Sequence, residues 1–149
     1  MCICSQAVQM QFLVAQDGIL HYTGIRMILG IGIDITEIER IAKSIESEAF
    51  QRKVFTSAEL KSCVKIKNSA ECLAGKFAAK EAFMKALSAG IRQQVWFMQI
   101  EVLNDESGKP YITVSGEAER RLQQSGAQQV HVSISHSGGM AVAAVILEG

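Results

Sequence analysis

The feature that most constrains this chain is a long, alanine-rich helical pattern in its middle. The run Asn68-Ser-Ala-Glu71 has the spacing of a capping box, which predicts the start of a helix. The pattern continues to Ala89, and Gly90 is placed to end it. The rest of the chain is therefore expected to pack against one long helix.

Shorter patterns lie on both sides of this helix. Alternating apolar residues bounded by turn signals predict strands, whereas apolar residues three or four positions apart predict helices. The predicted order is a strand at 28–33, helices from 36 to about 47, from 56 and from 68, strands at 98–103 and 111–114, a helix at 115–124, and strands at 130–134 and 140–147. This order predicts an α+β fold with a mainly antiparallel sheet.

The length and composition are those of a globular protein of one domain. Apolar residues make up 48% of the 149 residues and charged residues 20%, a usual balance for a packed core. Fifteen basic and fifteen acidic residues give a formal net charge of zero, which argues against general binding to nucleic acid. No run of 18 apolar residues is present, so we expect no span of a membrane.

The four cysteines predict no zinc site. Cys2, Cys4, Cys63 and Cys72 form no CxxC pair, and no cluster of histidines completes a set of zinc ligands. We expect free thiols in a reducing compartment, and hence a cytoplasmic protein.

Residues 1–26 show no clear helical or strand period. Met27 directly precedes the first apolar strand, which favours residues 1–26 as an upstream extension, not native or poorly ordered, and Met27 as the natural start. The alternative is a genuine first hairpin, because residues 11–20 are apolar enough to form one.

Asp34 is the first of three features that could carry chemistry. It follows an apolar strand and precedes a predicted helix, which places its carboxylate at the rim of a sheet. Such an oxygen is a ligand that a hard cation prefers. The alternative is that Asp34 only caps the following helix.

The second feature lies on the long helix. Lys76 and Lys80 are four positions apart, as are Glu81 and Lys85, so each pair shares one face. This spacing predicts a basic ridge beside a Glu81–Lys85 stripe, and the alternative is a solvated, salt-bridged face. Glu81 is flanked by alanine and phenylalanine residues, so we expect it near the buried side, where a carboxylate needs a partner such as a metal ion.

The third feature is the run Ser133-Ile-Ser-His-Ser-Gly-Gly139. Hydroxyl groups, an imidazole and the free amides of a Gly-Gly turn can hold phosphate oxygens. The alternative is an ordinary polar strand end and hairpin. Together the three features suit a bound pyrophosphate ester, because phosphoryl chemistry depends on positioning and charge neutralisation.

The sequence also resembles a known family. The run GIGIDITEIER from Gly30 to Arg40 is similar to the opening signature of the holo-acyl-carrier-protein synthases, and FAAKEAFMK at 77–85 is similar to their second signature. The run SISH from Ser133 to His136 resembles the third. The resemblance covers residues 27–147 in order, and it predicts a single-lobe 4′-phosphopantetheinyl transferase domain at 27–149.

The resemblance implies a reaction of fatty acid biosynthesis and lipid metabolism. The 4′-phosphopantetheine arm of coenzyme A would pass to a serine of an acyl carrier protein, with Mg²⁺ as cofactor and adenosine 3′,5′-bisphosphate as the second product. The implied metal ligands are Asp34 and Glu81, the implied catalytic residues are these two and Lys85, and the implied coenzyme A contacts are Lys76, Lys80, Lys85, Ser135 and His136. The general base stays open between Glu81 and a water on the metal.

The resemblance implies a homotrimer as well. Longer, two-lobed relatives place the acidic and the Ser-His signatures in different lobes, so Ser135 and His136 are expected to meet coenzyme A held by a neighbouring subunit. Arg40 is the expected contact with the carrier protein. Thr36 stands where the longer relatives carry a third acid, and its hydroxyl could hold a water there; Lys76 stands where the family usually has arginine.

Two other functions remain as alternatives. A magnesium-dependent hydrolase of nucleotide pyrophosphates would need an acidic run for a second metal, and the sequence lacks one. A non-catalytic module that binds coenzyme A would be favoured by loss of Asp34 or Glu81, and both are present.

Overall fold

The computed structural model describes residues 12–14, 20–22, 26–64 and 66–149. Strands β1 (Phe12–Val14) and β2 (Leu20–Tyr22) pair with each other in antiparallel orientation. Apart from Arg26, the rest of the predicted upstream extension, with Cys2 and Cys4, lies outside the described residues. The extension therefore stays a prediction.

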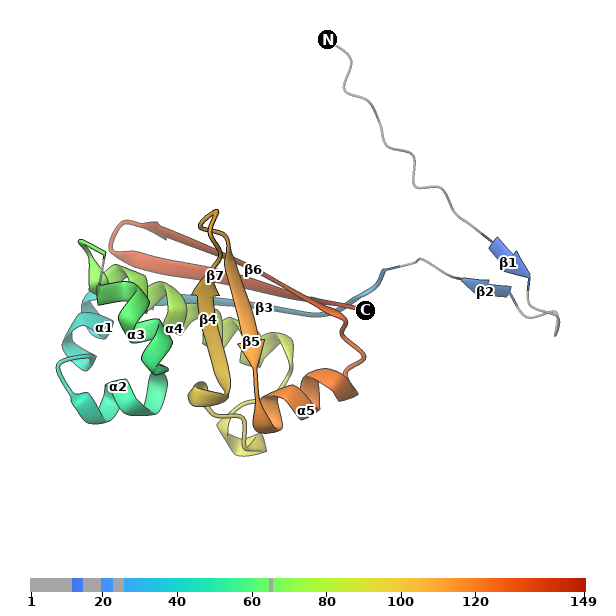
Figure 1. Ribbon diagram of the computed structural model, residues 1–149, viewed down its shortest axis with the longest axis horizontal. Helices are drawn as coiled ribbons and strands as arrows, with labels where there is room; N and C mark the ends of the chain where they lie inside the picture. The colour runs from blue at the N-terminus through green and yellow to red at the C-terminus, as the bar shows by residue number, and fades with distance from the viewer. Residues whose placement is uncertain (1–11, 15–19, 23–25, 65) are drawn as a thin grey trace, which may run out of the picture.

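A three-stranded antiparallel sheet and one long helix form the centre of the molecule (Figure 1). The sheet has the order β3-β7-β6, formed by β3 (Ile28–Glu37), β7 (Met140–Glu148) and β6 (Gln129–Ser137). Helix α4 (Ser69–Ala86) packs on one face of this sheet. The predicted α+β class, with an antiparallel sheet against a long helix, is confirmed.

Smaller elements complete the fold. Helices α1 (Ile38–Ser44), α2 (Glu48–Val54) and α3 (Ser57–Val64) lie between β3 and α4 in the chain. After α4 come the short 3₁₀ helices η1 (Ile91–Gln93) and η2 (Phe97–Gln99), the hairpin of β4 (Ile100–Asn104) and β5 (Pro110–Val114), and helix α5 (Gly116–Gln124). Among the described residues, no helix has both the length and the apolar character required to cross a membrane.

Two of the predicted helix starts are confirmed by their hydrogen bonds. The backbone N–H of Thr56 donates to Glu59 Oε2 at 2.7 Å, and the N–H of Glu59 donates back to Thr56 Oγ1 at 3.3 Å. Asn68 accepts from the N–H of Glu71 at 3.3 Å in the same way.

Other predicted helix boundaries are wrong. Helix α4 ends at Ala86 rather than Ala89, because Ser88 takes a left-handed conformation (φ 52°) that turns the chain away. The predicted first helix was expected to reach Ser47, but Ser47 instead caps a separate helix, α2, by accepting from the N–H of Phe50. Thr36 does not cap α1, since it is still part of β3 and the N-cap is Glu37.

Helix α4 and strand β3 approach each other at two glycines. A Cβ atom on Gly32 would lie 1.9 Å from the carbonyl oxygen of Ala82, and one on Gly30 would lie 2.1 Å from that of Ala86. No side chain larger than hydrogen fits at either position. Successive residues of a strand alternate between its faces, so Asp34 and Thr36 also face this helix.

The expectation of free thiols is wrong for two of the four cysteines. Cys63 and Cys72 form a disulfide, with their Cα atoms 5.7 Å apart. Their spacing of nine residues matches no short cysteine motif, so the sequence pattern gave no signal. The bond joins the last turn of α3 to the first turn of α4, which the short connection between these helices brings together.

The contact between Gly32 and Ala82 makes a prediction about stability. We expect Gly32→Ala to lower the free energy of unfolding by about 2–3 kcal/mol or more, because the new methyl group meets backbone that cannot rotate away. Gly90→Ala is the matched control, since a Cβ there meets no atom within 4 Å. Urea unfolding of the two variants checks the prediction, and equal losses at both positions would contradict it.

Candidate active site

Asp34 is held between a threonine and a lysine. Lys85 Nζ lies 2.7 Å from Asp34 Oδ1 and also donates to the carbonyl oxygen of Ile33 at 3.0 Å. The hydroxyl of Thr36 donates to Asp34 Oδ2 at 2.9 Å. Asp34 therefore faces α4 and does not cap helix α1, so the alternative reading of this residue is excluded.

Glu81 lies half-buried on α4 close to this group. Burial raises the pKa of Glu81 above its ordinary value, and the negative charge of Asp34 raises it further. The positive charges of Lys85 and Arg40 act in the opposite direction. The structure therefore brings Asp34, Glu81 and Lys85 together, although they come from positions up to 51 residues apart in the chain.

This pair of carboxylates fits a magnesium ion. Two acidic groups that repel each other are relieved by a cation, and Mg²⁺ commonly takes one or two protein carboxylates together with substrate phosphate and water. The described residues contain no group of three or more His, Cys, Asp or Glu side chains that could hold a metal by themselves. Asp34 and Glu81 are the residues that would hold such an ion, with the rest of its shell supplied by other groups.

Arg40 lies beside this site and packs over the aromatic ring of Phe77. Its guanidinium carbon lies 5.8 Å from the centroid of the Phe77 ring, and Phe77 stacks on Phe97 with a centroid distance of 5.3 Å. Arg40 is exposed, so its charge is available to a partner at the rim of the site.

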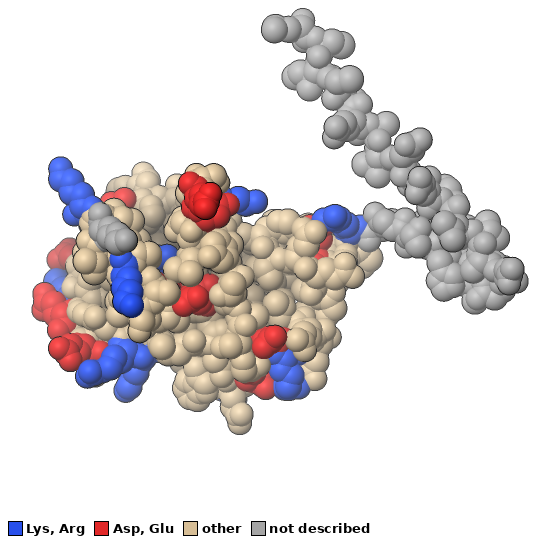
Figure 2. Space-filling view, viewed as in Figure 1, with Lys and Arg blue, Asp and Glu red and all other residues tan. Residues whose placement is uncertain are grey.

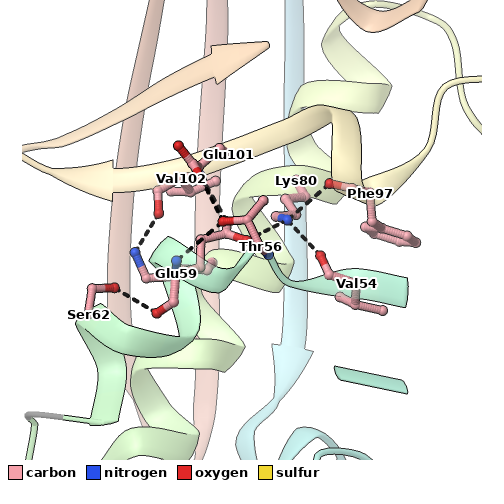
Figure 3. Close-up of polar contacts among 9 residues, drawn as sticks. Val54, Thr56, Glu59, Ser62, Lys80, Phe97, Glu101 and Val102 are labelled. Carbon is pink, nitrogen blue, oxygen red and sulfur yellow. Dashed lines mark hydrogen bonds and ion pairs between the residues drawn. The ribbon is translucent and has the colours of Figure 1, made fainter. Parts of the chain in front are cut away.

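Lys80 is buried inside the molecule rather than on an exposed ridge, and Figure 3 shows its polar contacts. Its ammonium group is 2.7 Å from Glu59 Oε2 and donates to the carbonyl oxygens of Val54 and Phe97 at 2.6 and 3.0 Å. Burial lowers the pKa of Lys80, and the carboxylate of Glu59 opposes that shift. The predicted basic ridge is wrong here, because all three N–H donors of Lys80 are engaged within the chain, and we assign Lys80 no contact with coenzyme A.

Lys76 is buried as well. Only 2% of this residue is exposed, and its ammonium group donates to the carbonyl oxygen of Val102. Burial lowers the pKa of Lys76, with the charge of Glu59 acting against it. The alternative of a solvated, salt-bridged face is equally wrong, since Lys85 pairs with Asp34 on strand β3 and not with Glu81 on its own helix.

Ser135 and His136 lie near the end of strand β6, on opposite faces of the sheet. The Nε2 atom of His136 lies 3.0 Å from the carbonyl oxygen of Glu71, in the first turn of α4. The ring rests on Gly75, where a Cβ would come within 2.8 Å of Nε2. A cavity of about 290 Å³ opens beside it, lined in part by His136, Glu71, Gly75 and Pro110.

The predicted site is divided into two parts within this chain. Thr36, Ala141 and His136 occupy one row across β3, β7 and β6. Two strand spacings, roughly 9–10 Å of backbone, therefore separate β3 from β6 at this level. Asp34, Glu81 and Lys85 gather at the β3 side, whereas His136 and its cavity lie at the β6 side.

Sequence reasoning missed two features of this region. The first is the buried pair of Lys80 and Glu59, for which the alanines around Lys80 on α4 were an available signal of burial. The second is the close fit of His136 on Gly75, which depends on two segments 61 positions apart and left no local pattern.

Comparison with known proteins agrees with this arrangement. The model of the 4′-phosphopantetheinyl transferase superfamily matches residues 30–145. Proteins named holo-[acyl-carrier-protein] synthase from Halothermothrix orenii and Trichlorobacter lovleyi are each 47% identical over 124 residues, which cover 82% of this chain and 98% of theirs.

Solved structures give the same result. The synthase of Neisseria meningitidis is 34% identical, with a TM-score of 0.75, over 83% of this chain and 100% of that one. The synthase of Bacillus anthracis in complex with CoA (3′,5′-ADP) is 43% identical, with a TM-score of 0.68, over 82% and 97%. The chain therefore belongs to the 4′-phosphopantetheinyl transferase superfamily and, within it, is an enzyme of the holo-[acyl-carrier-protein] synthase type.

The raised pKa of Glu81 makes a prediction about stability and pH. A carboxyl whose pKa rises on folding weakens the fold as the pH increases from its ordinary pKa of 4.5 through the raised value. Glutamine does not ionise, so we expect Glu81→Gln to melt at a higher temperature than the wild type at pH 8, with the gain shrinking towards pH 4. Thermal unfolding across this range measures it.

The exposed Glu106→Gln in the β4–β5 turn is the control and should follow the wild type. A melting temperature of Glu81→Gln at or below that of the wild type at pH 8 would show that burial and the charge of Asp34 do not act on this carboxyl.

Proposed function

We propose that this protein transfers the 4′-phosphopantetheine arm of coenzyme A to a serine of an apo-acyl carrier protein in a Mg²⁺-dependent reaction. The products are the holo-carrier protein and adenosine 3′,5′-bisphosphate. The observation that carries the proposal is the convergence of Asp34, Glu81 and Lys85 beside α4. Support also comes from the similar synthase of Helicobacter pylori, whose structure is in complex with coenzyme A.

In this proposal Asp34 and Glu81 would hold the magnesium ion, which would neutralise charge on the pyrophosphate. Lys85 gives up its ion pair with Asp34 to contact a phosphate oxygen, a change that its half-exposed side chain allows. The candidates to accept the proton of the attacking serine are Glu81 and a water held at the metal site. The serine oxygen bonds to the β-phosphorus as the bond to the α-phosphate oxygen breaks.

The outer face of the sheet supports assembly into a homotrimer. Ile31, Ile33 and Ile35 of β3 are 59–60% exposed on the face opposite α4. Exposed apolar patches of this kind commonly mark a protein interface. Ser135 pairs through Val142 with Ile35 in the same outward row, so a subunit docked there would meet Ser135 directly.

Assembly would also join the two halves of the site. In the proposed trimer, Ser135 and His136 of one subunit contact coenzyme A held by Asp34 and Glu81 of the next. The cavity beside His136 is polar at Glu71 and apolar at Pro110 and Ile134, which suits part of such a ligand.

Arg40 is the proposed contact with the carrier protein. Acidic and basic residues are interspersed on the face shown in Figure 2, so no broad basic surface is seen there. Arg40 stands out because its charge acts on Glu81 at the site itself.

The proposed reaction would serve fatty acid biosynthesis in the cytoplasm.

The transfer is tested by mass spectrometry. We expect an apo-acyl carrier protein incubated with this protein, coenzyme A and Mg²⁺ to gain the mass of one phosphopantetheine, and Asp34→Ala to lower the rate at least about 100-fold, equivalent to several kcal/mol of lost charge stabilisation. Breakdown of coenzyme A without transfer would favour the hydrolase, and binding without reaction would favour the non-catalytic module.

The shared site is tested by mixing inactive subunits. Asp34→Ala and His136→Ala damage different halves, so a mixed trimer contains some sites with both halves intact. We expect equimolar variants, dissociated and reassembled together, to regain a measurable fraction of wild-type activity, whereas each variant reassembled alone regains none. No gain on mixing would refute a site built from two subunits.

A further inference from the structure

Thr36 places a hydroxyl group at a buried position where an apolar side chain of similar volume would also fit. The residue is 1% exposed and points from β3 towards α4. Removing a hydroxyl from water costs free energy unless it is hydrogen-bonded, and valine would fill a similar volume without that cost. The hydroxyl of Thr36 has its hydrogen bond with Asp34 Oδ2, at 2.9 Å.

The two oxygens of Asp34 have partners of different kinds. Oδ2 accepts from the buried Thr36, whose branched side chain has few rotamers. Oδ1 accepts from Lys85, whose side chain is 51% exposed and long enough to move aside. One partner is therefore fixed by the core and the other is exchangeable.

The spacing of the two residues accounts for this contact. Residues i and i+2 of a strand lie on the same face about 7 Å apart, within reach of two short side chains. Gly30 and Gly32 place the same face of β3 directly on the backbone of α4, and Thr36 is buried there.

We propose that Thr36 is a positioning residue, which orients the carboxylate of Asp34 so that the oxygen facing Lys85 is presented to the divalent cation. This inference rests on the proposed function. It differs from the expectation that the hydroxyl holds a water in place of a third acid, because the role proposed here uses the hydrogen that Thr36 donates to Asp34. Hydrogen bonds that orient a metal-binding side chain commonly change affinity by about 10–100-fold.

The test compares Mn²⁺ binding among variants of the full chain loaded with coenzyme A, read from the electron paramagnetic resonance signal of free Mn²⁺. We expect Thr36→Val to raise the dissociation constant about 10-fold or more, and Thr36→Ser, which keeps the hydroxyl, to stay within about 3-fold of the wild type. Thr113→Val is the matched control, because Thr113 is an exposed strand residue outside the site.

Thermal unfolding of each variant shows whether it is folded, and Thr36→Ala provides a second removal of the hydroxyl. Wild-type affinity in a folded Thr36→Val or Thr36→Ala would overturn the proposal. So would a Thr36→Ser protein that binds as weakly as Thr36→Val, since the methyl group would then matter and not the hydroxyl. If the wild type itself binds no Mn²⁺ with coenzyme A present, the proposed function fails, and the role of Thr36 fails with it.

Discussion

The direct contact between strand β3 and the backbone of helix α4 determines most of what this protein can do. Gly30 and Gly32 let the strand lie on the carbonyl groups of Ala86 and Ala82, closer than any side chain would permit. Asp34 is two residues further along the same face, so this contact delivers its carboxylate to Glu81 and Lys85 on the helix. A side chain at either glycine would push the strand, and Asp34 with it, away from the helix.

A buried ion pair holds the other side of α4. Lys80 joins Glu59 of α3 to the carbonyl oxygen of Phe97, and Glu59 in turn accepts from the backbone N–H of Val102 at 2.9 Å. Isolated buried ion pairs add little net stability, because desolvation offsets their attraction. Their geometry is nevertheless specific, and here it ties α3, η2 and β4 to the helix that carries Glu81. The ring of Phe97 then supports Phe77 beneath Arg40.

The sequence predicted the fold class and several helix starts correctly. Two capping boxes, at Thr56 and Asn68, marked helix starts because their bonds lie within four residues. The end of α4 was missed because it depends on the left-handed conformation of Ser88. The separate helix α2 was missed because Ser47, which caps it, was read as the last residue of the preceding helix. The Cys63–Cys72 bond was missed for a similar reason, since it depends on how two helices meet.

By itself the sequence determined the order of elements, the resemblance to a family and the acids that could face a cation, because these depend on local spacing. Only the tertiary structure decided which lysine side chains are buried and which one lies at the site. Lys76, Lys80 and Lys85 look alike along the chain, yet two are buried against carbonyl groups and one reaches Asp34. It also decided that His136 lies across the sheet from Asp34, because strand pairing is fixed by contacts between distant segments.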